Sequence, residues 1–454
     1  MENVSGSGLA AGLRPPARTT YTVLLLCFLT IVSEGYDVGV MGVIVPALLH
    51  DAQWHLTPMQ IGEMGSAALI GTLFGSYLLS VVSDMMGRKP LIIGCVTLFS
   101  ISMLAAATLQ TPTGFWIARF IGGIGLGGVI STACALTVEY SPPEQRNRNF
   151  AIMYAGYSIG ALVSALVGMG FLASHGWRFV VAAGAIPLVL VPFLIRLLPE
   201  SLELLIARGR HDKAIALARR LSVPIVDLAH LQKAPAEQRS LRSVFAEVFS
   251  RQNAMGTICM WVAQVAAVTV IYGLGTWLPQ TMRKLGYDLG SSLSFLAVFM
   301  LSSAIGGILI GRISDRLGTR KTIAGGYVIG AIAIACLAIR GGGLLQNYLL
   351  VALAGCGSIG VAMVQLGFIA NYYAAGARAS ATGWAVGIGR VGAMGGPLIG
   401  GYLAAQNIDV AWNFYTFSAS ALIAGAAIAL TPRPQTAAAA AATGDTPPVH
   451  AGTH

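Results

Sequence analysis

The stretch Asp315-Arg316-Leu317-Gly318-Thr319-Arg320-Lys321 is a second copy of Asp84-Met85-Met86-Gly87-Arg88-Lys89, which lies 231 residues earlier. Each copy stands between two apolar runs. Other positions repeat at offsets of 231 to 233 residues: Gly75 and Gly306, Gly123 and Gly355, Tyr140 and Tyr372, Arg146 and Arg378, Pro46 and Pro279. Independent matches at nearly one offset, about half the chain length, indicate an internal duplication.

Composition indicates lipid as the solvent around this duplicated unit. Of the 454 residues, 55% are hydrophobic and 10% are charged, whereas a soluble domain carries about 25% charged residues. A spanning helix needs roughly 20 apolar residues, and twelve runs meet this requirement: 21–49, 59–82, 91–109, 113–139, 149–173, 177–198, 254–280, 291–314, 322–340, 346–371, 380–404 and 411–431. We therefore predict an all-α membrane protein with twelve transmembrane helices in two pseudo-symmetric six-helix bundles.

The segments around the apolar runs predict the domain organisation and the orientation. We expect a cytoplasmic tail (1–20), an N-terminal bundle (21–198), a cytoplasmic linker (199–253), a C-terminal bundle (254–431) and a disordered cytoplasmic tail (432–454). The beginning of the linker, residues 199–220, reads as an amphipathic surface helix. With both termini inside, 22 of the 28 Lys and Arg residues are cytoplasmic, as the positive-inside rule requires. The first run is too long for the apolar core of a cleaved signal, so we interpret it as a membrane helix.

Several function classes are disfavoured. The net charge of +10 comes from short basic stretches between apolar runs, which suits membrane lipid as a partner and not nucleic acid. The six cysteines lie in apolar runs without CxxC spacing, so we expect no metal and no cofactor. No nucleophile–base pair or phosphate-binding loop is recognisable, so we do not expect an enzyme. We expect a monomer.

The repeated loop resembles the GxxxDxxGRK pattern of the major facilitator superfamily; the first copy has Ser80 where the second keeps Gly311. Within that superfamily the chain resembles the aromatic acid:proton symporters. The stretches that carry this resemblance are Glu34-Gly35-Tyr36-Asp37, Arg119-Phe120 with the glycines that follow, Trp277-Leu278-Pro279, and Gly387-Ile388-Gly389-Arg390-Val391-Gly392-Ala393. Glu34 stands where that family usually has Asp, and Ser131-Thr132 where it often has Pro-Asn. The resemblance implies the major facilitator fold.

Four charged residues fall inside predicted spans, where charge costs at least ~2.5–3.5 kcal/mol each and tends to be functional. Glu34 and Asp37 are three apart and share one helix face, so we expect them to couple transport to protons. Arg119 and Arg390 are candidate substrate-binding residues, because guanidinium matches a carboxylate. The alternatives are interhelical hydrogen bonds for the carboxylates, pairing of Arg119 with them, and a salt bridge from Arg390 across the halves.

Less specific candidates could line the same cavity. Tyr272 and Trp384 could stack on an aromatic ring, and Gln264 and Gln365 are polar groups in apolar runs. Trp277 is expected to anchor its helix at the membrane interface, where Trp is common.

The repeated loops and their surroundings form a second group of candidates. The resemblance implies a gating role for Asp84, Arg88, Asp315 and Arg320 at the cytoplasmic helix ends. Glu139 and Arg146 are expected to join the same network. The alternative is that these charges only orient the chain in the membrane.

Together these observations predict a secondary active transporter of the bacterial inner membrane. We expect import of a small aromatic carboxylate, similar to benzoate or hydroxybenzoate, by proton symport with alternating access. The alternatives are a proton-coupled exporter, a symporter of another organic anion, and a membrane sensor that does not transport.

Overall fold

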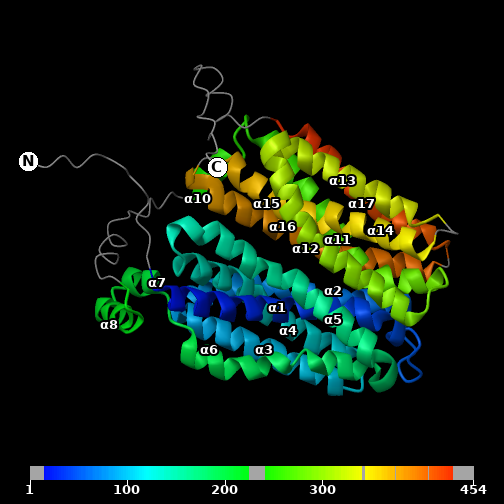
Figure 1. The fold of residues 1–454 in the computed structure, drawn as a ribbon, viewed down its shortest axis with the longest axis horizontal. Helices are drawn as coiled ribbons and strands as arrows, with labels where there is room; N and C mark the ends of the chain where they lie inside the picture. Colours follow the sequence, from blue (N-terminus) through cyan, green and yellow to red (C-terminus); the bar gives the residue numbers. More distant parts are fainter. Residues whose placement is uncertain (1–14, 224–240, 340–342, 374, 407, 433–454) are drawn as a thin grey trace, which may run out of the picture.

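The computed structural model describes residues 15–223, 241–339, 343–373, 375–406 and 408–432, and this part of the chain is almost entirely helical. Figure 1 shows two bundles side by side, one formed by α1 to α6 and the other by α11 to α17. The helices of the first bundle are α1 (Ala17–Leu48), α2 (Pro58–Met86), α3 (Arg88–Thr108), α4 (Pro112–Glu139), α5 (Arg146–Ala183) and α6 (Val191–Leu197). Those of the second are α11 (Ala254–Lys284), α12 (Leu289–Leu317), α13 (Thr319–Cys336), α14 (Leu344–Gly355), α15 (Val361–Tyr372), α16 (Ala375–Ala405) and α17 (Ala411–Leu430).

The predicted fold class is confirmed, with two differences in detail. Among the described residues, eight helical spans are long and apolar enough to cross a membrane by length and composition alone. The fifth and sixth predicted spans are joined in α5, where Gly176 (φ 75°, ψ 172°) breaks the helix, and the sixth continues through a 3-10 turn into α6. The tenth span is α14 and α15 joined by a π-helical turn, Cys356–Gly360.

The repeated loop motif is explained by its glycine. Gly87 alone separates α2 from α3, and Gly318 alone separates α12 from α13. Their φ angles are 116° and 88°, values that glycine adopts without the clash a side chain would cause. Each glycine ends one helix and starts the turn into the next. Both halves therefore place a charged loop at the equivalent position, between α2 and α3 and between α12 and α13.

The two bundles use the same packing scheme. In the first, α1 packs extensively on α5 and α2 on α4; in the second, α11 packs on α16 and α12 on the π-helical turn between α14 and α15. The bundles meet through α2 and α16, α5 and α12, and α1 and α11. Small residues permit this approach: a side chain at Gly42 would collide with the backbone of Gly275, and one at Gly62 with that of Pro397.

The predicted surface helix at 199–220 is wrong in one respect, because the structure has two short helices there. These are α7 (Leu202–Ala207) and α8 (His211–Leu221). Gly209 between them has a φ of 68°, which a continuous helix does not allow. A further helix, α10 (Leu241–Val248), precedes α11. Residues 1–14 of the predicted tail 1–20, residues 433–454 of the predicted tail 432–454, and residues 224–240 of the linker lie outside the described residues.

Candidate functional site

Helix α1 carries the two predicted proton-coupling carboxylates into the protein interior. Glu34 and Asp37 are 3% and 2% exposed. The helix lies very close to α5, because a side chain at Gly35 would overlap the backbone of Tyr157 and one at Gly39 would overlap α5 as well. Glycines on the face that packs against α5 therefore hold the carboxylates at a fixed depth between helices.

Asp37 pairs with Arg119 of α4, and both side chains are 3% exposed. Arg119 Nη1 donates to Asp37 Oδ1, and Nη2 donates to the Asp37 carbonyl oxygen at 3.3 Å. The pairing that the sequence left open as an alternative is therefore present. Within the described part of the chain, Asp37 Oδ2 and Arg119 Nε have no hydrogen-bond partner. The pair thus carries no net charge, but Asp37 Oδ2 can still accept a hydrogen bond and Arg119 Nε can still donate one.

Glu34 has no direct partner of this kind. Its Oε2 atom is buried and unbonded among the described residues. The positive charge that acts on it most comes from Arg390 of α16, in the other half. No N–O distance within 4.0 Å joins these two side chains in the part of the chain that the structure describes. A carboxyl and a guanidinium from different halves therefore lie within electrostatic range of each other but form no ion pair among the described residues.

Tyrosines surround this boundary. The hydroxyl groups of Tyr157 (α5) and Tyr272 (α11) are 2.8 Å apart and hydrogen-bond the two halves to each other. The ring of Tyr154 stacks on that of Tyr157, and the charge of Arg390 acts on both Tyr154 and Tyr272. The structure thus brings the predicted Tyr272 to the central charges. Tyr154 and Tyr157 were missed by the sequence analysis, although their three-residue spacing on one apolar helix was a usable signal.

Gln264 and Gln365 are joined in a buried chain inside the second half. The Tyr327 hydroxyl donates to Gln365 Oε1 at 2.5 Å, and Gln365 Nε2 donates to Gln264 Oε1 at 2.9 Å. Gln264 lies against Gly389, the neighbour of Arg390. The two predicted glutamines therefore belong together, and Gln264 is the member that packs on α16.

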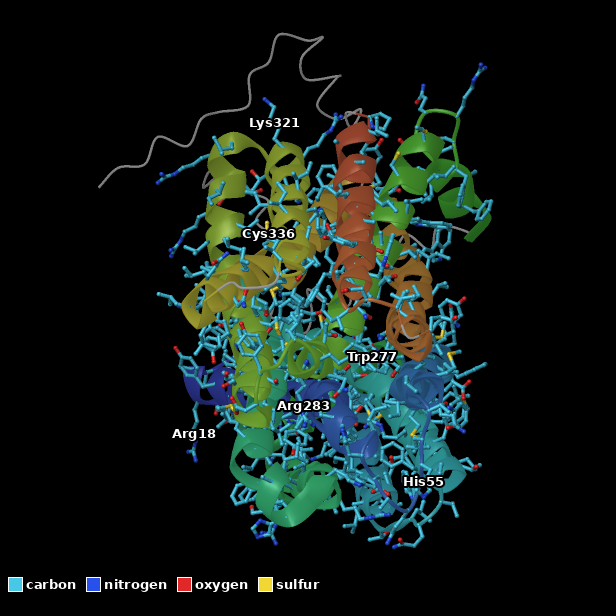
Figure 2. The ribbon with its side chains drawn as sticks, turned by 90° about the vertical axis from the view of Figure 1, so that its right-hand side faces the viewer. Arg18, His55, Trp277, Arg283, Lys321 and Cys336 are labelled. Atoms are coloured by element: carbon cyan, nitrogen blue, oxygen red, sulfur yellow. The ribbon has the colours of Figure 1, made fainter. Side chains whose placement is uncertain are left out.

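The two tryptophans lie elsewhere than expected. Trp384 packs against Phe245 and Phe249, with ring centroids 5.8 and 6.5 Å away, in a cluster next to α10; the structure does not bring it to the central charges. The prediction that Trp277 anchors its helix at the membrane interface is wrong. Trp277 is 2% exposed, its Nε1 donates to the Pro397 carbonyl oxygen at 2.9 Å, and Figure 2 shows it near the boundary between the halves.

The first copy of the loop motif joins a dense polar network. Arg88 Nη1 lies 2.7 Å from Glu139 Oε2. Glu139 also accepts hydrogen bonds from Ser201 Oγ at 2.7 Å and from the Leu202 backbone N–H at 2.6 Å, at the start of α7. Glu139 is 2% exposed. The predicted partners Arg88 and Glu139 therefore meet, and they fasten the linker to the first half.

The second copy makes different contacts. Arg320 donates to the Ala429 carbonyl oxygen of α17, and Asp315 is exposed. Arg146 has a buried Nε atom without a hydrogen-bond partner among the described residues. Asp84 lies in the last turn of α2, and its side chain lies outside the described residues. Among the described residues, no hydrogen bond or ion pair joins the two copies.

Comparison with known proteins agrees with this architecture. The model of the Major Facilitator Superfamily matches residues 27–369 and, in a second match, 295–451. A benzoate transport protein of Acinetobacter baylyi is 32% identical over 412 residues, or 89% of this chain and 87% of that protein. A gallate transporter of Pseudomonas putida is 32% identical over 430 residues, or 91% and 92%. A partially occluded inward open structure of the E. coli xylose transporter XylE has a TM-score of 0.72 at 18% identity, covering 90% of this chain and 98% of that one.

The family model and these relatives show that the chain is a multi-pass membrane transporter and not an enzyme. The chain belongs to the Major Facilitator Superfamily and, within it, to the family of aromatic acid transporters.

Proposed function

We propose that this transporter imports a small aromatic carboxylate, similar to benzoate or hydroxybenzoate, together with protons. The observation that carries the proposal is that Glu34 and Arg390, from different halves, lie within electrostatic range of each other, while Glu34 Oε2 is buried and unpaired among the described residues. The names of the relatives, a benzoate transport protein and a gallate transporter, support the substrate class.

Competition for one guanidinium accounts for coupling. Arg390 is half-buried and can hold a carboxylate through two parallel hydrogen bonds. An ionised Glu34 would attract the same guanidinium and repel the substrate anion. A proton on Glu34 removes both effects, so the anion and the proton bind better together than separately. Coupling free energies between such sites are typically about 1–3 kcal/mol.

The remaining buried groups have supporting roles in this proposal. Asp37 and Arg119 form the second proton-sensitive pair, with Asp37 Oδ2 free to take a proton. Tyr272, Gln264 and Gln365 line the substrate cavity. Trp384 is left out of the substrate site because of its place beside Phe249.

Movement follows from the two-half construction. Bundles 21–198 and 254–431 rock against each other around the central site, with the linker 199–253 and the tails 1–20 and 432–454 in the cytoplasm. In this proposal the loop residues Asp84, Arg88, Asp315 and Arg320, with Glu139 and Arg146, control the cytoplasmic side. The protein works as a monomer in the bacterial inner membrane.

The test is uptake of labelled benzoate into proteoliposomes whose interior is more alkaline than the exterior. Wild-type protein should accumulate the label, and a protonophore should abolish accumulation. Glu34→Gln, which mimics a protonated carboxyl, should lose gradient-driven accumulation yet still exchange external for internal benzoate. Accumulation that depends neither on the proton gradient nor on the protonophore would refute proton symport. Accumulation only when the vesicle interior is more acidic than the exterior would indicate a proton-coupled exporter.

A further inference from the structure

Three aromatic side chains on α5 form a ladder of nearly parallel rings. Phe150 and Tyr154 have ring centroids 5.9 Å apart at an interplanar angle of 19°, and Tyr154 and Tyr157 are 6.2 Å apart at 12°. Spacings of four and three residues place them on one face of the helix. We refer to these three residues as the α5 ladder.

The ladder leads from one end of α5 to the central charges. Phe150, four residues after the first residue of α5, is 37% exposed, whereas Tyr157 is 8% exposed. At its inner end the Tyr157 hydroxyl meets that of Tyr272 from the other half. The charges of Glu34 and Arg390 act on Tyr154, the middle member. The ladder therefore runs beside the proposed substrate site.

Tyr154 has a polar group that packing alone does not explain. Its side chain is half-buried, and among the described residues no hydrogen bond joins its hydroxyl to another group, although this oxygen is not one of the fully buried unpaired atoms. The hydroxyl therefore keeps some exposure and both its donor and its acceptor capacity, whereas phenylalanine would fill the same space without a hydrogen-bonding group. The hydroxyl is thus available to a ligand.

We propose that the α5 ladder is the surface on which the aromatic ring of the substrate binds, with Tyr154 at its centre. The substrate carboxylate lies on Arg390, the ring packs on the aromatic side chain of Tyr154, and the free hydroxyl of Tyr154 bonds a hydroxyl substituent on that ring. This inference rests on the proposed function, and it adds that Tyr154 distinguishes aromatic from saturated rings and hydroxylated from plain rings.

The test compares three acids in the proteoliposome assay: benzoate, 4-hydroxybenzoate and cyclohexanecarboxylate, whose saturated ring offers no π-face. Tyr154→Leu should raise the KM for benzoate about tenfold, since an aromatic pair contributes beyond its buried area, and should change the KM for cyclohexanecarboxylate about twofold at most. Tyr154→Phe should leave the benzoate KM unchanged and raise that of 4-hydroxybenzoate. Phe171→Leu is the matched control, because Phe171 lies on the same helix, is 43% exposed and packs on Phe179 outside the ladder.

The outcomes separate this inference from the proposed function. Wild-type protein that takes up no aromatic acid overturns the proposed function. Wild-type protein that prefers benzoate, with the same benzoate-to-cyclohexanecarboxylate KM ratio in Tyr154→Leu, overturns the ladder alone. An equal loss of preference in Phe171→Leu also overturns it. Should Tyr154→Leu not reach the membrane, Phe150→Leu decides: a rise of about threefold in the benzoate-to-cyclohexanecarboxylate KM ratio supports the ladder, and an unchanged ratio refutes it.

Discussion

In the first half, α1 and α4 bury the ion pair of Asp37 and Arg119. The positions one repeat later, 233 and 232 residues on, are Val270 and Val351, each 0% exposed. The second half packs corresponding helices, so the fold of a half does not require the ion pair. The comparison shows that this buried charge pair lies between α1 and α4 of the first half, at positions where the duplicated architecture does not need charge.

The largest expected effect comes from removing one member of the ion pair that distinguishes the first half from the second. Arg119→Val leaves a buried carboxylate without its counter-charge, which typically costs about 3–5 kcal/mol. We expect a large fall in the thermal unfolding midpoint of the purified protein and no uptake.

The double variant Arg119→Val with Asp37→Val makes the first half resemble the second at both positions. Replacing a buried ion pair by packed apolar residues is often neutral or stabilising, so the unfolding midpoint should return close to that of the wild type while uptake stays absent. A double variant as unstable as the single one would mean that the pair is needed for the fold.

A smaller effect is expected at Arg390, the charge that the second half contributes. Arg390→Lys keeps the charge but loses the planar fork that holds a carboxylate through two hydrogen bonds. Losing one of them, about 1.4 kcal/mol, should raise the KM for benzoate about tenfold. Initial uptake rates at a series of benzoate concentrations measure this, with thermal stability as the control. An unchanged KM would remove Arg390 from substrate binding.

The loop motif offers the next comparison, because among the described residues its first copy bonds the linker, whereas Arg320 of its second copy bonds α17. Glu139→Gln weakens the bonds to Arg88, Ser201 and the start of α7. Hydrogen bonds to charged groups contribute about 1.5–3 kcal/mol each, so limited proteolysis should cut near α7 several-fold faster. Arg320→Gln, in the second copy, should leave cleavage there unchanged. Equal effects would mean that the two copies act alike.

How far the sequence predicts this molecule depends on the range of the interaction. The twelve spans follow from local hydrophobicity, and the Gly87 and Gly318 turns from a repeated motif. How deeply a tyrosine is buried, and toward which helix it points, does not follow from the sequence. Tyr is common at membrane interfaces, and a single sequence does not show which helix packs against it. Tyr154 and Tyr157 were missed for that reason. Trp384 was placed differently because its neighbours, Phe245 and Phe249, come from a segment far away in sequence.

The smallest expected effect concerns the outer loops, where the halves again differ. Asp51, after α1, accepts from Trp177 Nε1 at 2.9 Å and from the backbone N–H groups of Gln53 and Trp54. Partial burial opposes ionisation, but these bonds outweigh it and hold the pKa of Asp51 below its usual value. Asp288, which caps the start of α12 in the second half, accepts hydrogen bonds from Ser291 of that helix, and these bonds also lower its pKa.

Asp51→Asn should therefore lower stability at neutral pH by about 1 kcal/mol, after discounting for partial solvent exposure. A depressed pKa in the folded state means that the contribution is complete above the unfolded pKa of about 3.9, and is lost as the pH falls through the lower, folded value. Unfolding midpoints measured from pH 7 down to pH 3 should thus converge for Asp51→Asn and wild type. Asp288→Asn should match wild type throughout, because Asn caps a helix about as well as Asp. A difference in unfolding midpoint between Asp51→Asn and wild type that stays constant at every pH would show that the charge of Asp51 does not stabilise these loops of the first half.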